Sequence, residues 1–197
     1  MGHLLINIHG FLSSHQSPKV LALGDAIRHR FPSVDFVSPA LPDRPKDAVA
    51  VVESLITQHA DQYKTIGLIG HSMGAYFATC LAVRHQLKAV LVNPVVRGYE
   101  IMCEFYGPVH NPHTGRDFEI DETDIDYLVS IYLEALPEPW RFLLMQQLGD
   151  EIVDPAVAKE YYRDSPRIVE QGGNHDFAGL ENHTDEIVHF LFGEARL

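Results

Sequence analysis

The sequence predicts a three-layer α/β fold, in which about six mostly parallel strands form a sheet covered by helices on both faces. Segments with the apolar density of buried strands alternate with helix-like segments from the first residues onward. This alternation is typical of parallel sheets, because parallel strands need crossover connections and the connecting helices pack on the sheet. The chain has 197 residues, of which 46% are hydrophobic, and this is enough for one domain with a substantial core. We therefore expect residues 1–197 to form a single domain.

The first half of the chain follows this alternation closely. Pro18 and Pro45 stand at the starts of helical patterns, where proline is tolerated, and Pro39 ends the second strand. A glycine-containing apolar segment followed directly by a helix-forming run indicates a sharp strand-to-helix turn at Ser72. The expected strands are residues 4–9, 34–38, 65–71 and 88–94, and the expected helices are residues 17–31, 45–60 and the run after Ser72.

The alternation breaks down over residues 97–139. This segment mixes glycines and prolines with an acidic stretch and contains one helical pattern, near residues 124–135. We interpret it as an insertion that forms a small cap over the functional site. After it, strands are expected at residues 140–148 and 167–173, and helices at residues 155–163 and from about Thr184 onward.

Composition argues against several classes of partner. Asp and Glu total 27 against 15 for Lys and Arg, so the formal net charge is -12. This excess repels nucleic-acid phosphates and anionic lipid surfaces, and no segment approaches the ~20 apolar residues of a membrane span. We therefore expect a cytoplasmic protein that binds neither nucleic acid nor membranes. The two cysteines, Cys80 and Cys103, are too few for a disulfide framework and are expected to be free thiols.

The pentapeptide GHSMG at residues 70–74 matches G-x-S-x-G, the nucleophile elbow of the α/β-hydrolase fold. In an elbow, a tight turn after a strand lifts the serine above the sheet, and the glycines keep neighbouring side chains from clashing. The turn also sets Ser72 at a helix N-terminus, which favours developing negative charge. A glycine-flanked N-cap serine is the alternative. The placement between an apolar strand and a helix favours Ser72 as a nucleophile.

A serine hydroxyl needs a general base, which this fold supplies late in the chain, after the last strand. The segment GGNHDF at residues 172–177 offers His175 there, and its glycines allow the loop to turn back over the carboxyl ends of the strands. His71 precedes the nucleophile but points away from it in an elbow, so we expect it to line the pocket or to pack. His110 and His113 lack a third ligand, and we expect no metal site.

The base in turn needs an acid, which the chain order Ser, Asp, His places after the penultimate strand. The segment LGDEIVD at residues 148–154 offers Asp150, Glu151 and Asp154. Asp150 follows the strand and a glycine, and we predict that it is the acid. Asp154 precedes Pro155, which favours a role as the N-cap of the next helix.

An oxyanion hole in this fold uses the N–H of the residue after the nucleophile and one from the loop after the first core strand. These are the N–H groups of Met73 and Phe11. Gly10 allows close backbone approach to the substrate oxygen. The serines of this loop, Ser13 and Ser14, lack an elbow and are expected to be turn hydroxyls.

The combined motifs resemble the YqiA-type bacterial esterases of the α/β-hydrolase superfamily over nearly the whole chain. The matching segments are INIHGF at 6–11, IGHSMG at 69–74, LVNPVVRGYE at 91–100, NPHTG at 111–115, QLGDEIVD at 147–154 and EQGGNHDF at 170–177. The resemblance implies a sheet of strand order 2-1-3-4-5-6 and no metal or organic cofactor. By position it implies Ser72 as nucleophile, Asp150 as acid and His175 as base.

Two further positions belong to this resemblance. Asn93, with Pro94 and Arg97, looks like a signature of the group, and we expect Asn93 either to shape the pocket rim or to cap a strand end. The group often has serine where this chain has His71, a difference that bears on the polarity of the pocket.

The expected reaction is cleavage of a small-molecule carboxylic ester through an acyl-enzyme on Ser72. The same chemistry suits acyl-CoA thioesters, and we keep an acyl-CoA thioesterase as an alternative. A local basic patch that involves Arg44, Lys46 or Arg97 would support the thioesterase despite the unfavourable net charge. A non-catalytic binding protein on a hydrolase scaffold is a third hypothesis. The aromatic residues of the insertion are expected either to line an acyl pocket or to fill the core of the cap: Phe105, Tyr106, Phe118, Tyr127 and Tyr132.

Overall fold

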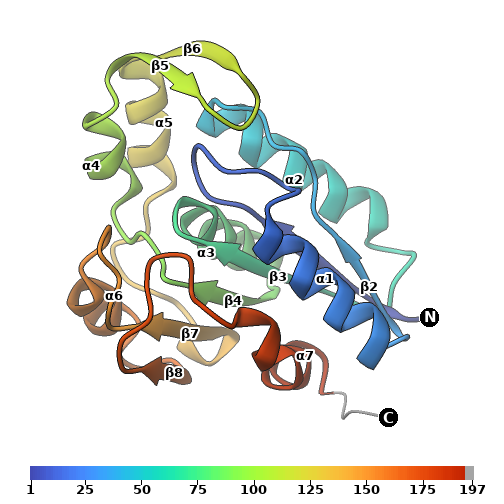
Figure 1. Ribbon diagram of the computed structural model, residues 1–197. Coiled ribbons are helices and arrows are strands. Elements are labelled where there is room, and N and C mark those ends of the chain that lie inside the picture. Colours follow the sequence, from blue (N-terminus) through green and yellow to red (C-terminus); the bar gives the residue numbers. More distant parts are fainter. Residues whose placement is uncertain (194–197) are drawn as a thin grey trace.

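The computed structural model describes residues 1–193, and within them six parallel strands form one central sheet (Figure 1). The strand order is β2-β1-β3-β4-β7-β8, and every neighbouring pair is parallel. Since β7 and β8 are the fifth and sixth strands of this sheet, the predicted order 2-1-3-4-5-6 is confirmed. The strands are β1 (His3–Ile8), β2 (Val34–Val37), β3 (Thr65–His71), β4 (Lys88–Val92), β7 (Phe142–Gln147) and β8 (Arg167–Glu170).

Helices cover both faces of the sheet. Helices α1 (Pro18–Arg30) and α7 (Thr184–Phe192) lie on one face, and α2 (Pro45–His59) and α3 (Met73–His85) lie on the other, as Figure 1 shows. Successive side chains of a strand point to opposite faces of the sheet, and the side chains of β1 accordingly belong to two hydrophobic cores, one on each face. Leu4, Ile6 and Ile8 join the core beneath α2 and α3, whereas Leu5 joins the core beneath α1 and α7. The short helix α6 (Pro155–Tyr161) connects β7 to β8.

The insertion between β4 and β7 contains more regular structure than the sequence predicts. It holds α4 (Gly98–Cys103), an antiparallel hairpin of β5 (Gly107–Asn111) and β6 (Arg116–Ile120), α5 (Glu122–Ile131) and a 3-10 turn at Pro139–Arg141. The helix expected at residues 124–135 begins earlier, because Asp121 caps it in a reciprocal pair with Asp124. The two strands of the hairpin are not predicted from the sequence. Both are short, and their side chains are mainly exposed or half-buried, so they lack the apolar density of a buried strand.

Polar contacts fasten the insertion to the segment before α2. Arg44, at the start of α2, donates hydrogen bonds to Asp121 at 2.6 Å and to Asp124 at 2.8 Å. Asn111 of β5 donates to Asp43. Apolar residues of β6 and α5 complete the attachment, since Ile120 and Leu128 belong to the core beneath α2 and α3. Among residues 1–193, no helix has the combination of length and apolar character that crossing a membrane requires.

Candidate active site

Ser72 lies in a strained turn between β3 and α3. Its backbone angles are φ 55° and ψ -121°, a region that non-glycine residues rarely adopt and that is found at functional sites. The turn is tight enough to require glycine on both sides. A Cβ at Gly70 would collide with the carbonyl oxygen of Gly74, and a Cβ at Gly74 would collide with the carbonyl oxygen of Ile8. The pattern G-x-S-x-G therefore has a steric cause here.

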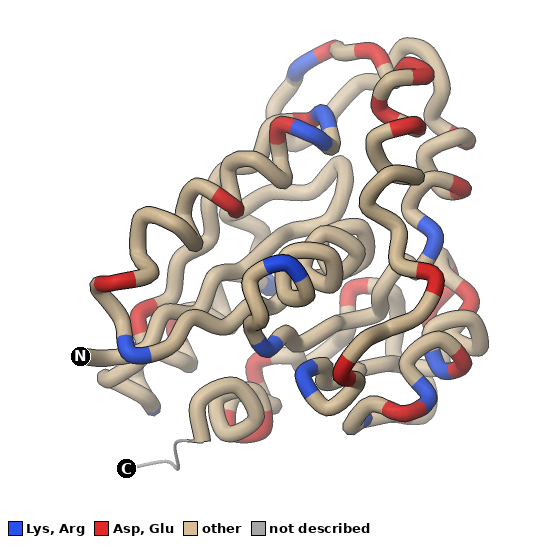
Figure 2. The backbone as a smooth tube through the Cα atoms, turned by 180° about the vertical axis from the view of Figure 1, so that it is seen from behind, with Lys and Arg blue, Asp and Glu red and all other residues tan. Residues whose placement is uncertain are grey.

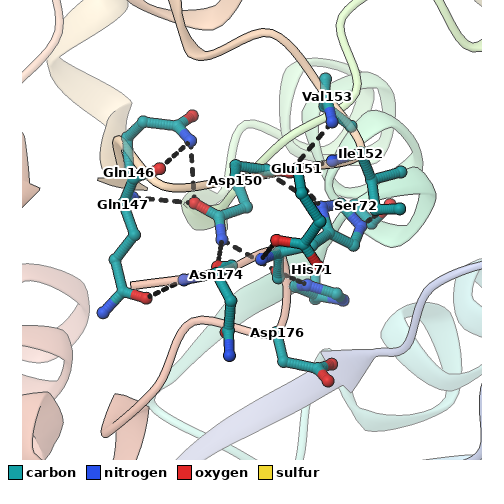
Figure 3. Close-up of polar contacts among 12 residues, drawn as sticks. His71, Ser72, Gln146, Gln147, Asp150, Glu151, Ile152, Val153, Asn174 and Asp176 are labelled. Carbon is teal, nitrogen blue, oxygen red and sulfur yellow. Dashed lines mark hydrogen bonds and ion pairs between the residues drawn. The ribbon is translucent and has the colours of Figure 1, made fainter. Parts of the chain in front are cut away.

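The structure brings Ser72, His175 and Asp150 together from three different loops. Ser72 and Asp150 are labelled among the polar contacts of this region in Figure 3. His175 Nε2 lies 2.9 Å from Ser72 Oγ, and His175 Nδ1 lies 2.9 Å from both carboxylate oxygens of Asp150. Because a carboxylate only accepts, this contact assigns the proton to Nδ1 and leaves Nε2 free to accept the serine hydroxyl. The imidazole is 16% exposed and the Asp150 side chain is fully buried.

The loop after β7 holds Asp150 in place. One of its carboxylate oxygens accepts the backbone N–H groups of Ile152 and Val153, both at 2.9 Å. The neighbouring Glu151 accepts the backbone N–H of His175 at 3.0 Å. Of the carboxylates in residues 148–154, Asp150 is the one that faces the imidazole ring.

Asp154 caps α6 instead. Its side chain accepts the backbone N–H of Ala156 at 2.8 Å, and Pro155 occupies the first helical position. This is the geometry of an N-cap residue, which satisfies a backbone donor left free at a helix start.

Asp154→Ala should therefore lower the free energy of unfolding by about 1 kcal/mol while leaving ester turnover close to wild type. The loss comes from the unsatisfied N–H group in the first turn of α6. Thermal denaturation and a turnover assay on the same preparation measure both effects. A large loss of turnover with unchanged stability would move the acid from Asp150 to Asp154.

The loop after β1 passes directly beside the nucleophile. A Cβ at Gly10 would lie 3.4 Å from the Cβ of Ser72 and 3.3 Å from the carbonyl oxygen of His71. Met73 is the first residue of α3, where N–H groups lack intrahelical acceptors. These positions bring the backbone around Phe11 and Met73 to the serine, and their role as oxyanion donors stays a prediction.

The insertion reaches this loop through aromatic side chains. The ring of Phe11 meets that of Phe105 edge-on at 5.1 Å and that of Phe118 at 6.0 Å between centroids. Tyr106 is 65% exposed and takes no part. A cavity of about 610 Å³ lies between α6 and the segment that follows α5, and none of Ser72, Asp150 and His175 lines it.

Several polar residues beneath the base were not predicted from the sequence. Gln147 accepts the backbone N–H groups of Asn174 and Ala178, and Lys19 forms an ion pair with Asp176 at 3.0 Å. Asn93 is fully buried, and its amide nitrogen and oxygen are both engaged within the protein. No side-chain atom of Asn93 is therefore left to shape a pocket rim. Two adjacent glutamines at the carboxyl end of an apolar strand are the signal that could have revealed this network.

Comparison with known proteins supports the same architecture. The model of the uncharacterised protein family UPF0227 matches residues 4–192. Est1E of Butyrivibrio proteoclasticus, solved with ferulic acid bound, superposes with a TM-score of 0.74 at 12% identity, over 97% of this chain and 90% of that one. The mouse alpha/beta hydrolase domain-containing protein 10 gives a TM-score of 0.71 at 18% identity, over 94% and 89%. An esterase of Pyrococcus furiosus gives 0.66 at 14% identity, over 96% and 80%. The predicted α/β-hydrolase fold is confirmed.

Proposed function

The chain belongs to the uncharacterised protein family UPF0227, the YqiA-type group of the α/β-hydrolase superfamily, and we propose that it is a serine hydrolase that cleaves small-molecule carboxylic esters. The observation that supports this most strongly is the hydrogen-bonded series Ser72, His175 and Asp150, with 2.9 Å at each contact. Esterases among the proteins of similar fold agree with it.

In the proposed reaction, His175 Nε2 accepts the hydroxyl proton of Ser72 as Oγ attacks the ester carbonyl carbon. The new charge on the carbonyl oxygen is held by the N–H groups of Phe11 and Met73. Asp150 keeps the proton of the imidazole on Nδ1 and stabilises the imidazolium.

The imidazolium then gives its proton to the leaving alcohol, and the acyl group stays on Ser72. Water replaces the alcohol at the same position, and His175 takes its proton as it attacks the acyl carbon. Collapse of the second tetrahedral intermediate returns Ser72 and releases the carboxylic acid. Every proton transfer uses the same imidazole nitrogen, so no metal or organic cofactor is needed for this cycle.

The charge distribution favours an ester over an acyl-CoA thioester. Arg44 is paired with Asp121 and Asp124, and Arg97 lines a different cavity from Arg44 and Lys46. Between residues 98 and 140, Arg116 is the single Lys or Arg, whereas acidic residues recur throughout (Figure 2). The negative charges of this insertion would therefore repel the phosphate groups of a nucleotide carrier such as coenzyme A.

The test is a series of 4-nitrophenyl esters and acyl-CoA thioesters of increasing chain length, assayed with the purified protein. We expect kcat/KM to be higher for the esters than for the matched thioesters. Turnover of the thioesters alone would identify a thioesterase, and turnover of neither class, together with tight binding of an ester, would identify a binding protein.

A further inference from the structure

Two side chains from neighbouring strands converge on the backbone carbonyl oxygen of His175. His71, the last residue of β3, donates from Nε2 at 2.7 Å, and Asn93, just after β4, donates from Nδ2 at 2.8 Å. The amide of Asn93 also donates to the carbonyl oxygen of Asn174 at 2.9 Å. His71 and Asn174 are labelled in Figure 3 among the polar contacts of this region.

Both donors are fixed in orientation. The Asn93 oxygen accepts hydrogen bonds from the side chain of Gln146 and from the backbone N–H of Gln147, both at 2.9 Å. A flipped amide would turn its oxygen toward two carbonyl groups, so the observed orientation is the only satisfied one. For His71, the carbonyl partner only accepts, and Nε2 must therefore carry a proton.

The charge state of His71 suits this role. Burial, followed by the positive charge of Lys19, lowers the pKa of His71 to about 3. The ring consequently stays neutral at neutral pH, with its proton on Nε2. The ring centroid lies 4.9 Å from that of His175, so the two imidazoles also contact each other.

The loop that carries the base, residues 171–176, has no hydrophobic side chain. Gly172 and Gly173 have φ of 69° and 76°, and most side chains of residues 171–176 are exposed. Exposed loops with few apolar contacts open at low cost in free energy. Polar contacts therefore attach this loop: hydrogen bonds with His71, Asn93, Gln147 and Glu151, and the ion pair between Lys19 and Asp176.

We propose that His71 and Asn93 are positioning residues. Their hydrogen bonds to the backbone carbonyl oxygen of His175 set the distance between His175 Nε2 and Ser72 Oγ. The proposal rests on the proposed function of this site and adds residues that act through His175. A displacement of the base by about 1 Å costs about 10²-fold in rate, so a loosened loop should lower kcat more than it changes KM.

The test compares His71→Met with His71→Gln. Methionine fills the space of the ring and donates nothing, whereas glutamine extends an amide N–H group to about the position of Nε2. We expect kcat for a 4-nitrophenyl ester to fall about 10- to 100-fold in His71→Met with KM within about twofold, and to recover substantially in His71→Gln.

Thr79→Val is the matched control for lost stability. The Thr79 hydroxyl is buried on α3 and bonds to the Tyr162 hydroxyl and the Ala75 carbonyl, away from the base. This variant should lower the thermal midpoint without lowering kcat. Wild-type kcat in His71→Met, or a loss that glutamine does not restore, would overturn the proposal.

A spectroscopic measurement separates this proposal from the proposed function. The proton between His175 Nδ1 and Asp150 gives a low-field NMR resonance whose width reports exchange with water. We expect it to be sharp in wild type and in Thr79→Val, and broadened in His71→Met. A resonance unchanged in His71→Met would refute positioning by His71, whether or not the protein hydrolyses esters. Absence of ester turnover in wild type would count against the proposed function alone.

Discussion

Ser72→Ala is expected to lower ester turnover by on the order of 10⁴-fold or more, because loss of the nucleophile in such a site is nearly complete. The backbone of the elbow should survive, since Gly70 and Gly74 relieve its closest contacts and alanine needs no more room than serine. The measurements are turnover of a 4-nitrophenyl ester and the thermal midpoint of the same preparation.

Ser14→Ala is the control for this variant. The Ser14 hydroxyl lies in the loop after β1 and accepts the backbone N–H of Gln16 at 3.1 Å, as a turn hydroxyl does. Its loss should leave turnover near wild type. Activity of Ser72→Ala within tenfold of wild type would remove Ser72 from the mechanism.

Asp150→Asn should lower turnover by roughly 10³- to 10⁴-fold with little change in stability. The amide oxygen of asparagine can still accept the N–H groups of Ile152 and Val153, so the loop keeps its shape. Its amide nitrogen would then face His175 Nδ1 as a donor. This forces the ring proton onto Nε2, where it faces Ser72 and blocks general-base action.

Glu151→Gln is the comparison for this second variant. Glutamine retains an oxygen that can accept the backbone N–H of His175, so turnover should stay far above that of Asp150→Asn. Equal losses in the two variants would mean that total negative charge near the base matters more than the contact between Asp150 and the ring.

Much of the fold and of the site could be predicted from the sequence, because the signals are local. Strands such as residues 4–9 are apolar on both faces, and the glycines around Ser72 serve a turn that the pentapeptide itself defines. The distinction between Asp150 and Asp154 also follows from neighbouring residues, since Pro155 starts a helix that needs a cap.

Other features depend on contacts between distant segments. The hairpin of β5 and β6 has only three apolar residues besides Pro108 on its strands, Val109, Phe118 and Ile120, and they pack on the core of the rest of the domain. The ion pair between Arg44 and Asp124 joins residues 80 positions apart. The hydrogen bonds that hold the loop of His175 also join distant segments. Asn93 and Gln147 acquire their role only when parallel strands bring their carboxyl ends to one edge of the sheet.

The central claim is that Ser72 is the residue that becomes acylated, and covalent trapping tests it most directly. Wild-type protein is treated with a fluorophosphonate, digested and analysed by mass spectrometry, with Ser72→Ala treated in parallel. We expect one phosphonyl adduct per chain, on the peptide that contains Ser72, and none in Ser72→Ala. An unmodified wild-type chain, or an adduct that persists in Ser72→Ala, would contradict the claim.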